Sequence, residues 1–259
     1  MAKIIFFGNG PLADYALNIL EKQNEIIFHA RTKEDLETVK EIKAKNSEAH
    51  GVLASFGVII KKDILDLFEP EGILNIHPSL LPKYRGASPI ESAILNGDSD
   101  FSVSVMKLVK AMDAGPLYYQ KTFYNLELNK DHIYKTLAEA GAEFINENLQ
   151  DLPEPFVQND ADATFTTKLD KSMSKLTPEK DSASVTFRKI VAFQNFPKPK
   201  YDFYGKECII LEAEVSDLAP QSSLAIECAD GKFVIIKKLQ PAGKKPMDAK
   251  SFLNGYAKS

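Results

Sequence analysis

The sequence predicts an α/β protein in which a large domain built on a mostly parallel sheet is followed by a small, β-rich domain. Up to about residue 149, short apolar runs alternate with helical segments, which is typical of a parallel sheet covered by helices. A Pro-, Ser- and Lys-rich stretch follows, and short strand-like runs then return with a hairpin signal at Ala229-Asp230-Gly231. We therefore expect a first domain over residues 1–160, a linker over 161–183 and a second domain over 184–259.

Each element of the first domain has a local reason. Lys3 to Phe7 is an apolar run that ends at Gly8-Asn9-Gly10, and Pro11 suits the first position of the helix that continues to Lys22. Ser88 and Glu91 form a capping-box pattern at the start of another helix. The remaining expected strands are 25–29, 50–56, 73–77, 101–108 and 117–123, and the remaining helices are 32–45 and 131–149. In the second domain we expect a short helix over 188–193 and strands over 207–215, 224–227 and 232–239.

The composition indicates a soluble protein of a reducing compartment. The 259 residues are 44% hydrophobic and 26% charged, and no apolar stretch approaches the roughly 18 to 20 residues of a membrane span. The apolar run at the N-terminus is too short for a signal peptide. Cys208 and Cys228 have neither the spacing of a zinc site nor that of a disulfide framework. We expect a cytoplasmic protein with no membrane partner, no bound metal and two cysteines in its core.

Charge is distributed unevenly between the two halves of the sequence. Residues 1–163 hold 16 Lys and Arg against 25 Asp and Glu, a net charge of −9, whereas residues 164–259 hold 16 against 11, a net charge of +5. The basic half points weakly to a polyanionic partner, and a solvated surface explains it equally well.

Two segments carry residue types suited to catalysis. Asn75 and His77 are two apart on a predicted strand, so they project from the same face at the end where ligands bind in open α/β sheets. Pro78 and Pro82 stiffen the loop that follows. Further on, Asp113 opens an Asp-Ala-Gly-Pro turn, which taken alone is a common structural motif.

Together these segments resemble the formyltransferases that use 10-formyltetrahydrofolate. That family shows Asn-x-His-x-Ser-Leu-Leu-Pro-x-Tyr-Arg-Gly, then a helix ending in Gly-Asp, a strand and Asp-x-Gly, and the sequence contains each part in order. Leu239 to Met247 and Phe252 to Gly255 look like the closing motif of the methionyl-tRNA formyltransferases. The resemblance implies a Rossmann-like catalytic domain, an OB-like C-terminal domain and formyl transfer to methionyl-initiator tRNA. It indicates no additional protein partner.

The resemblance also implies roles for individual residues. Asn75 and a protonated His77 would donate hydrogen bonds to the oxyanion of a tetrahedral intermediate, and Asp113 would stabilise the imidazolium. The residues expected to contact folate are Phe56, Gly57, Val58, Ile59, Ser79, Leu80, Leu81 and Pro82. Basic residues, chosen mainly from the positively charged half, are expected to contact tRNA: Arg85, Arg188, Lys198, Lys200, Lys237, Lys238, Lys244 and Lys245.

The sequence departs from the methionyl-tRNA formyltransferases at three places. Members usually carry a basic loop after the second strand, but here about 20 residues separate His29 from His50 and they have the pattern of a plain helix. Ser102 replaces the usual Gly, and Val191 stands where Arg is typical. These differences concern the manner of tRNA contact rather than formyl transfer.

The sequence leaves three alternatives open. A formyltransferase acting on a nucleotide-linked amino sugar would share Asn75, His77 and Asp113 and would not need the basic loop. Gly8-x-Gly10-x-x-Ala13 with Arg31 is compatible with an NADP-dependent reductase. A non-catalytic RNA-binding protein would not need the complete set of three catalytic residues.

Overall fold

The structure is a computed structural model that describes residues 1–257, and it divides into two compact units. The first unit comprises Met1–Ile90 and Ser99–Thr167, and the second comprises Glu91–Asp98 and the chain from Lys168 onward. The last two positions of the predicted second domain, 258 and 259, lie outside the described residues. Helix α4 (Pro89–Asn96) crosses the boundary between the units.

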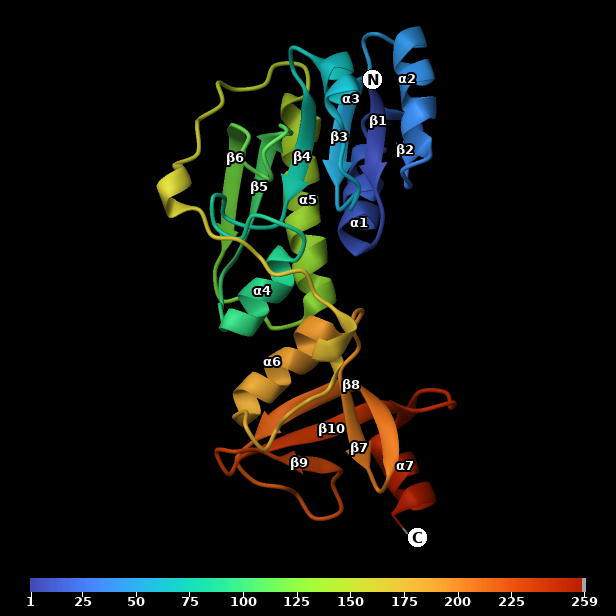
Figure 1. Ribbon diagram of the computed structural model, residues 1–259, viewed down its shortest axis with the longest axis vertical. Coiled ribbons are helices and arrows are strands. Elements are labelled where there is room, and N and C mark those ends of the chain that lie inside the picture. The colour runs from blue at the N-terminus through green and yellow to red at the C-terminus, as the bar shows by residue number, and fades with distance from the viewer. Residues whose placement is uncertain (258–259) are drawn as a thin grey trace. The chain divides into compact units, whose positions relative to one another are not determined.

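The first unit contains a six-stranded sheet in the order β2-β1-β3-β4-β5-β6 (Figure 1). The pairings β1–β2, β1–β3 and β3–β4 are parallel, while β4–β5 and β5–β6 are antiparallel. This confirms the mostly parallel α/β fold. Its strands are β1 (Lys3–Gly8), β2 (Glu25–Ala30), β3 (His50–Ala54), β4 (Ile73–His77), β5 (Phe101–Lys107) and β6 (Leu117–Phe123). Its helices are α1 (Pro11–Leu20), α2 (Asp35–Lys45), α3 (Lys62–Leu65), η1 (Asp66–Phe68), α5 (Lys130–Asn148) and η2 (Asp160–Asp162).

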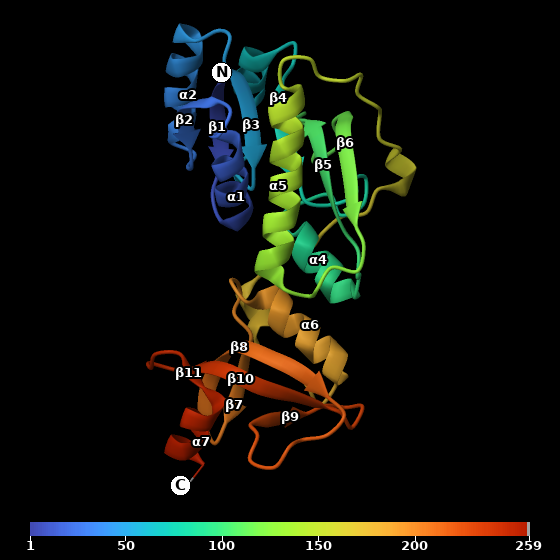
Figure 2. The same ribbon diagram turned by 180° about the vertical axis from the view of Figure 1, so that it is seen from behind.

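Helices cover both faces of this sheet (Figures 1 and 2). Alternate residues of a strand face opposite sides, and Ile5 and Phe7 of β1 pack in one apolar cluster with residues of α2 and α3. Helices α1 and α5 pack against each other on the opposite face. Gly141 lets α5 approach β4 closely, because a Cβ there would lie only 2.6 Å from Ile76 Cγ2. Ile76 therefore faces α5, which leaves Asn75 and His77 on the other side of β4.

The second unit is built on a curled antiparallel sheet with the strand order β11-β10-β8-β7, and β9 pairs with β10 (Figure 2). The expected hairpin is confirmed, since Glu227 pairs with Phe233 across the turn. The strands are β7 (Lys200–Phe203), β8 (Lys206–Ser216), β9 (Ala225–Glu227), β10 (Phe233–Pro241) and β11 (Met247–Asp248). From Lys168 onward, the helices of this unit are η3 (Lys171–Ser174), α6 (Ala183–Phe193) and α7 (Ala249–Tyr256).

The prediction missed β7, β11 and α7, and it began α6 five residues too late. Ser182 caps α6, because its hydroxyl accepts a hydrogen bond from the N–H of Val185. Cys208 and Cys228 lie in the apolar core of this unit, as expected. Burial raises the pKa of the Cys208 thiol to about 11.

Two kinds of feature are absent from the described residues. No helix in residues 1–257 combines the length and the apolar character that crossing a membrane requires. In the same residues, no group of three or more His, Cys, Asp or Glu side chains is placed to hold a metal ion.

Candidate functional site

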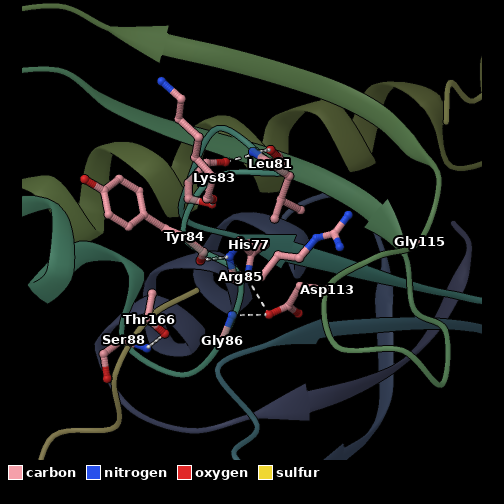
Figure 3. Close-up of polar contacts among 12 residues, drawn as sticks. His77, Leu81, Lys83, Tyr84, Arg85, Gly86, Ser88, Asp113, Gly115 and Thr166 are labelled. Carbon is pink, nitrogen blue, oxygen red and sulfur yellow. Dashed lines mark hydrogen bonds and ion pairs between the residues drawn. The ribbon is translucent and has the colours of Figure 1, made fainter. Parts of the chain in front are cut away.

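Asn75 and His77 lie at the carboxyl end of β4, where both are almost completely buried. The Nε2 atom of His77 lies 3.0 Å from the carbonyl oxygen of Tyr84. Because a carbonyl oxygen can only accept, this contact assigns a proton to Nε2. The other ring nitrogen, Nδ1, lies 3.7 Å from Oδ2 of Asp113 (Figure 3). The imidazole is thus oriented by one partner and faces a carboxylate with its other nitrogen.

Asp113 is held in an unusual backbone conformation between β5 and β6. Its φ angle is 47°, in the left-handed region that few residues other than glycine occupy. Its Oδ2 atom accepts a hydrogen bond of 2.7 Å from the N–H of Gly86 (Figure 3). Two residues later, a Cβ on Gly115 would lie 1.8 Å from the carbonyl oxygen of Lys107, so only glycine fits. The turn therefore has little freedom to move Asp113 away from His77.

A cavity of about 340 Å³ opens beside these residues. Its walls are mainly the loop after β3 and the segment after β5, and Asn75 and Asp113 supply polar groups at its edge. The lining includes four residues that were expected to contact folate: Phe56, Gly57, Val58 and Ile59. Of these, Ile59 lies at the open side of the cavity, since it is 88% exposed. An apolar pocket of this size with few polar groups is the usual form of a small-molecule site.

The other expected folate segment, Ser79 to Pro82, is not part of the cavity wall. Leu81 is buried in a small apolar cluster with Met106 and Leu117. The buried Ser104 hydroxyl donates to the Ser79 carbonyl at 2.6 Å and accepts from the Leu81 N–H at 3.1 Å. These contacts fix the conformation of the loop after β4, so this segment supports the cavity from outside it.

Sequence reasoning missed a segment that crosses the loop after β4, residues 156–166, which we call the strap. Thr164 and Thr166 exchange backbone hydrogen bonds with Arg85 at 2.8 Å. The Thr164 hydroxyl also accepts from the N–H of Tyr84. The Thr166 hydroxyl accepts from the N–H of Ser88, as Figure 3 shows. In the sequence this region has the composition of a linker, and the spacing of the two threonines is its only sign of extended structure.

The structure corrects the expectation that Arg85 contacts tRNA. Its side chain is only 5% exposed, and its guanidinium bonds to Gln158 at 2.8 Å and to Asp160 at 2.7 Å, both in the strap. All of these groups belong to the first unit. Arg85 therefore ties the strap to the loop after β4 and is not available to a phosphate.

The remaining basic residues predicted to bind tRNA occupy different environments. Lys200, Lys237 and Lys238 form exposed ion pairs with Glu207, Glu214 and Glu212. Arg188 is partly buried against Gly97, and its Nε has no hydrogen-bond partner within the described residues. Lys198, Lys244 and Lys245 are exposed, and in residues 1–257 none of these three takes part in an ion pair.

The connection between β2 and α2 is short, as the sequence indicated. Only residues 31–34 separate Ala30 from Asp35. The Asp35 carboxylate accepts hydrogen bonds from the N–H groups of Arg31 and Thr32 at 2.7 and 2.8 Å, and these bonds hold the pKa of Asp35 below its usual value. The chain therefore turns directly into the helix.

Comparisons with curated proteins identify relatives that align with almost the whole chain. A methionyl-tRNA formyltransferase of Wolbachia pipientis subsp. Culex pipiens (strain wPip) is 31% identical, and the alignment covers 99% of this chain and 97% of the relative. A methionyl-tRNA formyltransferase of Carboxydothermus hydrogenoformans is 33% identical over 93% of this chain and 82% of the relative.

Similar solved structures include HypX, a methionyl-tRNA formyltransferase and an N-formyltransferase, and at 17–18% identity they show the fold alone. HypX from Aquifex aeolicus in complex with tetrahydrofolic acid has a TM-score of 0.73 at 17% identity, and this chain spans about half of its length (100% of this chain, 48% of HypX). The methionyl-tRNA formyltransferase from Clostridium thermocellum has a TM-score of 0.69 at 18% identity, covering 93% of this chain and 98% of that one. An N-formyltransferase from Helicobacter canadensis, solved with folinic acid and dTDP-3-aminofucose, has a TM-score of 0.65 at 18% identity, covering 93% and 100%.

Two protein-family models match the chain, one in its N-terminal part and one in its C-terminal part. Residues 11–149 match the formyl transferase family, and residues 168–257 match the formyl transferase C-terminal domain. These two matches cover most of the sequence. The relative that aligns with 99% of the chain is itself named a methionyl-tRNA formyltransferase. The chain therefore belongs to the formyl transferase family.

Proposed function

We propose that this protein transfers the formyl group of 10-formyltetrahydrofolate to the amino group of methionyl-initiator tRNA. Family membership and curated relatives named methionyl-tRNA formyltransferase support this function. The observation that carries it is that Asp113 faces His77 at the end of β4 (Figure 3). Asn75 and Asp113 both line the apolar cavity there. The formylated product serves translation initiation, so we expect the protein to act in the cytoplasm, where initiator tRNA is charged.

The cavity suits a folate co-substrate. Its apolar walls, which include Phe56, Val58 and Leu108, can pack against the flat faces of a pterin ring, while backbone groups of the loop after β3 can bond to its edge. Lys110 is exposed at the wall and carries a positive charge suited to the glutamate carboxylates of folate. Asn75 and Asp113 would then lie next to the formyl group.

The tautomer of His77 suggests its part in proton transfer. With a proton on Nε2, the neutral ring presents the lone pair of Nδ1, which can accept the proton released by the attacking amine. The imidazolium that forms lies beside the Asp113 carboxylate, whose charge stabilises it. The same Nδ1 proton can then pass to the departing folate nitrogen, so His77 ends the cycle neutral.

Asn75 would stabilise the negative charge that develops on the formyl oxygen. Its amide can donate a hydrogen bond to the oxyanion from a fixed position at the strand end. Burial strengthens such a contact, because few water molecules compete for it. One donor of this kind typically lowers the barrier by about 3 kcal/mol.

A direct assay tests both the reaction and the acceptor. The protein is incubated with 10-formyltetrahydrofolate and either methionyl-initiator tRNA or a dTDP-linked amino sugar, and the formylated products are measured. We expect formylmethionyl-tRNA and no formylated sugar. Formylation of the sugar alone would transfer the assignment to the sugar-amine class, for which the short β2–α2 connection and a solved structural neighbour provide a reason. No formylation of either acceptor would refute the proposed reaction.

A further inference from the structure

We propose that Gln158 is a positioning residue that holds Asp113 in place for formyl transfer. This inference rests on the proposed function, since it assumes that Asp113 acts in the reaction. Gln158 lies in the strap and is only 7% exposed. Its Nε2 donates hydrogen bonds to the carbonyl oxygens of Asp113, at 2.9 Å, and Gly115, at 2.7 Å. One side chain thereby clamps both ends of the three-residue turn that carries the carboxylate.

The partners of Gln158 require one orientation of its amide. Its Oε1 accepts two hydrogen bonds from the Arg85 guanidinium, one from Nε at 3.2 Å and one from the terminal nitrogen at 2.8 Å. An arginine can only donate and a backbone carbonyl can only accept, so the oxygen must face Arg85 and the NH₂ group must face the turn. No other uncharged side chain of this length provides both an acceptor and two donors. The site therefore fits glutamine specifically.

The turn needs this clamp because its backbone is strained. Asp113 has a φ of 47°, and a residue with a side chain persists in that region only when surrounding contacts enforce it. The clamp acts on the main chain of Asp113, while the Gly86 N–H acts on its carboxylate at 2.7 Å. Both contacts direct Oδ2 toward Nδ1 of His77. Arg85 anchors the clamp in turn, because Asp160 and the backbone of Thr164 and Thr166 hold it.

The isosteric change Gln158→Glu separates the two halves of this arrangement. A glutamate keeps the acceptor for Arg85, but its second oxygen faces two carbonyl oxygens that cannot donate to it. We expect kcat for formyl transfer to fall about 100-fold, as for a small misplacement of a reacting group, while the KM for folate stays unchanged. Hydrogen exchange at the Gly86 amide should become faster, because the carboxylate that accepts from it is displaced.

Gln158→Met is the second variant, since it removes donors and acceptor without adding charge. The matched control is Asn159→Ala. Within residues 1–257, the side-chain amide of Asn159 forms its hydrogen bonds inside the strap, with Ala161 and Asp162. Normal kcat and Gly86 exchange in both Gln158 variants would overturn the inference, and so would an equal loss in Asn159→Ala. Failure of both Gln158 variants to fold would also overturn it, because the role would then be structural. If the parent protein formylates no acceptor, the proposed function fails, whereas Gly86 exchange without substrate still tests the positioning.

Discussion

The carboxyl end of β4 and the turn between β10 and β11 represent opposite ways to place functional groups. At the end of β4, Asn75, His77 and Arg85 are at most 5% exposed, and the partners of His77 and Arg85 are defined by distance and direction. In the β10–β11 turn, Lys244 and Lys245 are exposed to solvent. The hydrogen bonds that anchor this turn involve the main chain of its residues, such as the bond from the Gln240 amide to the Lys244 carbonyl. A group that must meet a reacting atom needs fixed geometry, whereas a charge that attracts a polyanion does not.

This difference determines how each region should respond to mutation. Removing one group at the end of β4 leaves a buried partner unsatisfied or a charge uncompensated, so single changes should have large effects. Exposed pairs such as Lys237–Glu214 and Lys238–Glu212 contribute only about 0 to 1 kcal/mol and are screened by salt. Substitutions of these exposed lysines should therefore have effects that are small, additive and dependent on ionic strength.

The largest expected effect follows from Asp113→Asn or His77→Ala. Either change removes the carboxylate–imidazole pair, so kcat should fall by at least about two orders of magnitude while folate binding persists. Single-turnover kinetics and a folate titration measure the two quantities. Asp100→Asn is the control, because its carboxylate accepts from the Asn125 N–H elsewhere in the same unit. Turnover near that of the parent protein would contradict the assignment.

A smaller effect is expected for Gly57→Val, which tests the cavity wall. The side chain would enter space that the folate needs, and we expect Kd for tetrahydrofolate to rise about tenfold, or about 1.4 kcal/mol. Gly205→Val is a matched control, because the two glycines have φ angles of 69° and 71° and neither has an atom within 4 Å of the added Cβ. The control imposes the same backbone strain away from the cavity. Equal Kd values in the two variants would place the folate site elsewhere.

The pair Lys244→Glu and Lys245→Glu should reduce tRNA affinity by a smaller factor at physiological salt. For every phosphate that the variant no longer binds, the slope of log affinity against log salt should decrease by about 0.7 to 0.9. Binding titrations at several salt concentrations measure this slope. A Lys22→Glu and Lys33→Glu pair changes the net charge equally at exposed positions of the first unit. If the two pairs behave alike, only total charge matters and the turn is not a tRNA contact.

The smallest effect concerns the cysteines. Cys208 is completely buried and its pKa is raised to about 11, and burial also raises the pKa of Cys228. Few thiolates are present near pH 8, so a thiol reagent should leave the native protein and its activity unchanged. The same reagent should modify both cysteines in denaturant. Rapid modification of the native protein would show that this core opens readily.

Local sequence patterns predicted the parts of the site that lie on regular structure. The spacing of Asn75 and His77 indicated a shared face because strand side chains alternate, and β4 has the expected bounds. The strap was missed because its composition is that of a linker and its partners lie about 39 to 80 positions away in the sequence. The tRNA contact expected of Arg85 was wrong for the same reason: a charge in a loop gives no sign that a distant glutamine and aspartate will enclose it.

The sequence by itself determined the alternation of strands and helices, the division into an α/β region and a β-rich region, and the family to which the chain belongs, since these depend on neighbouring residues and on ordered motifs. Only the tertiary structure decided which residues surround Asp113. Its left-handed backbone, the approach of Gly115 to Lys107 and the amide of Gln158 arise from contacts between segments that the fold brings together. Hydrogen-bond geometry depends on such distances to within tenths of an ångström, and residue order alone does not contain them.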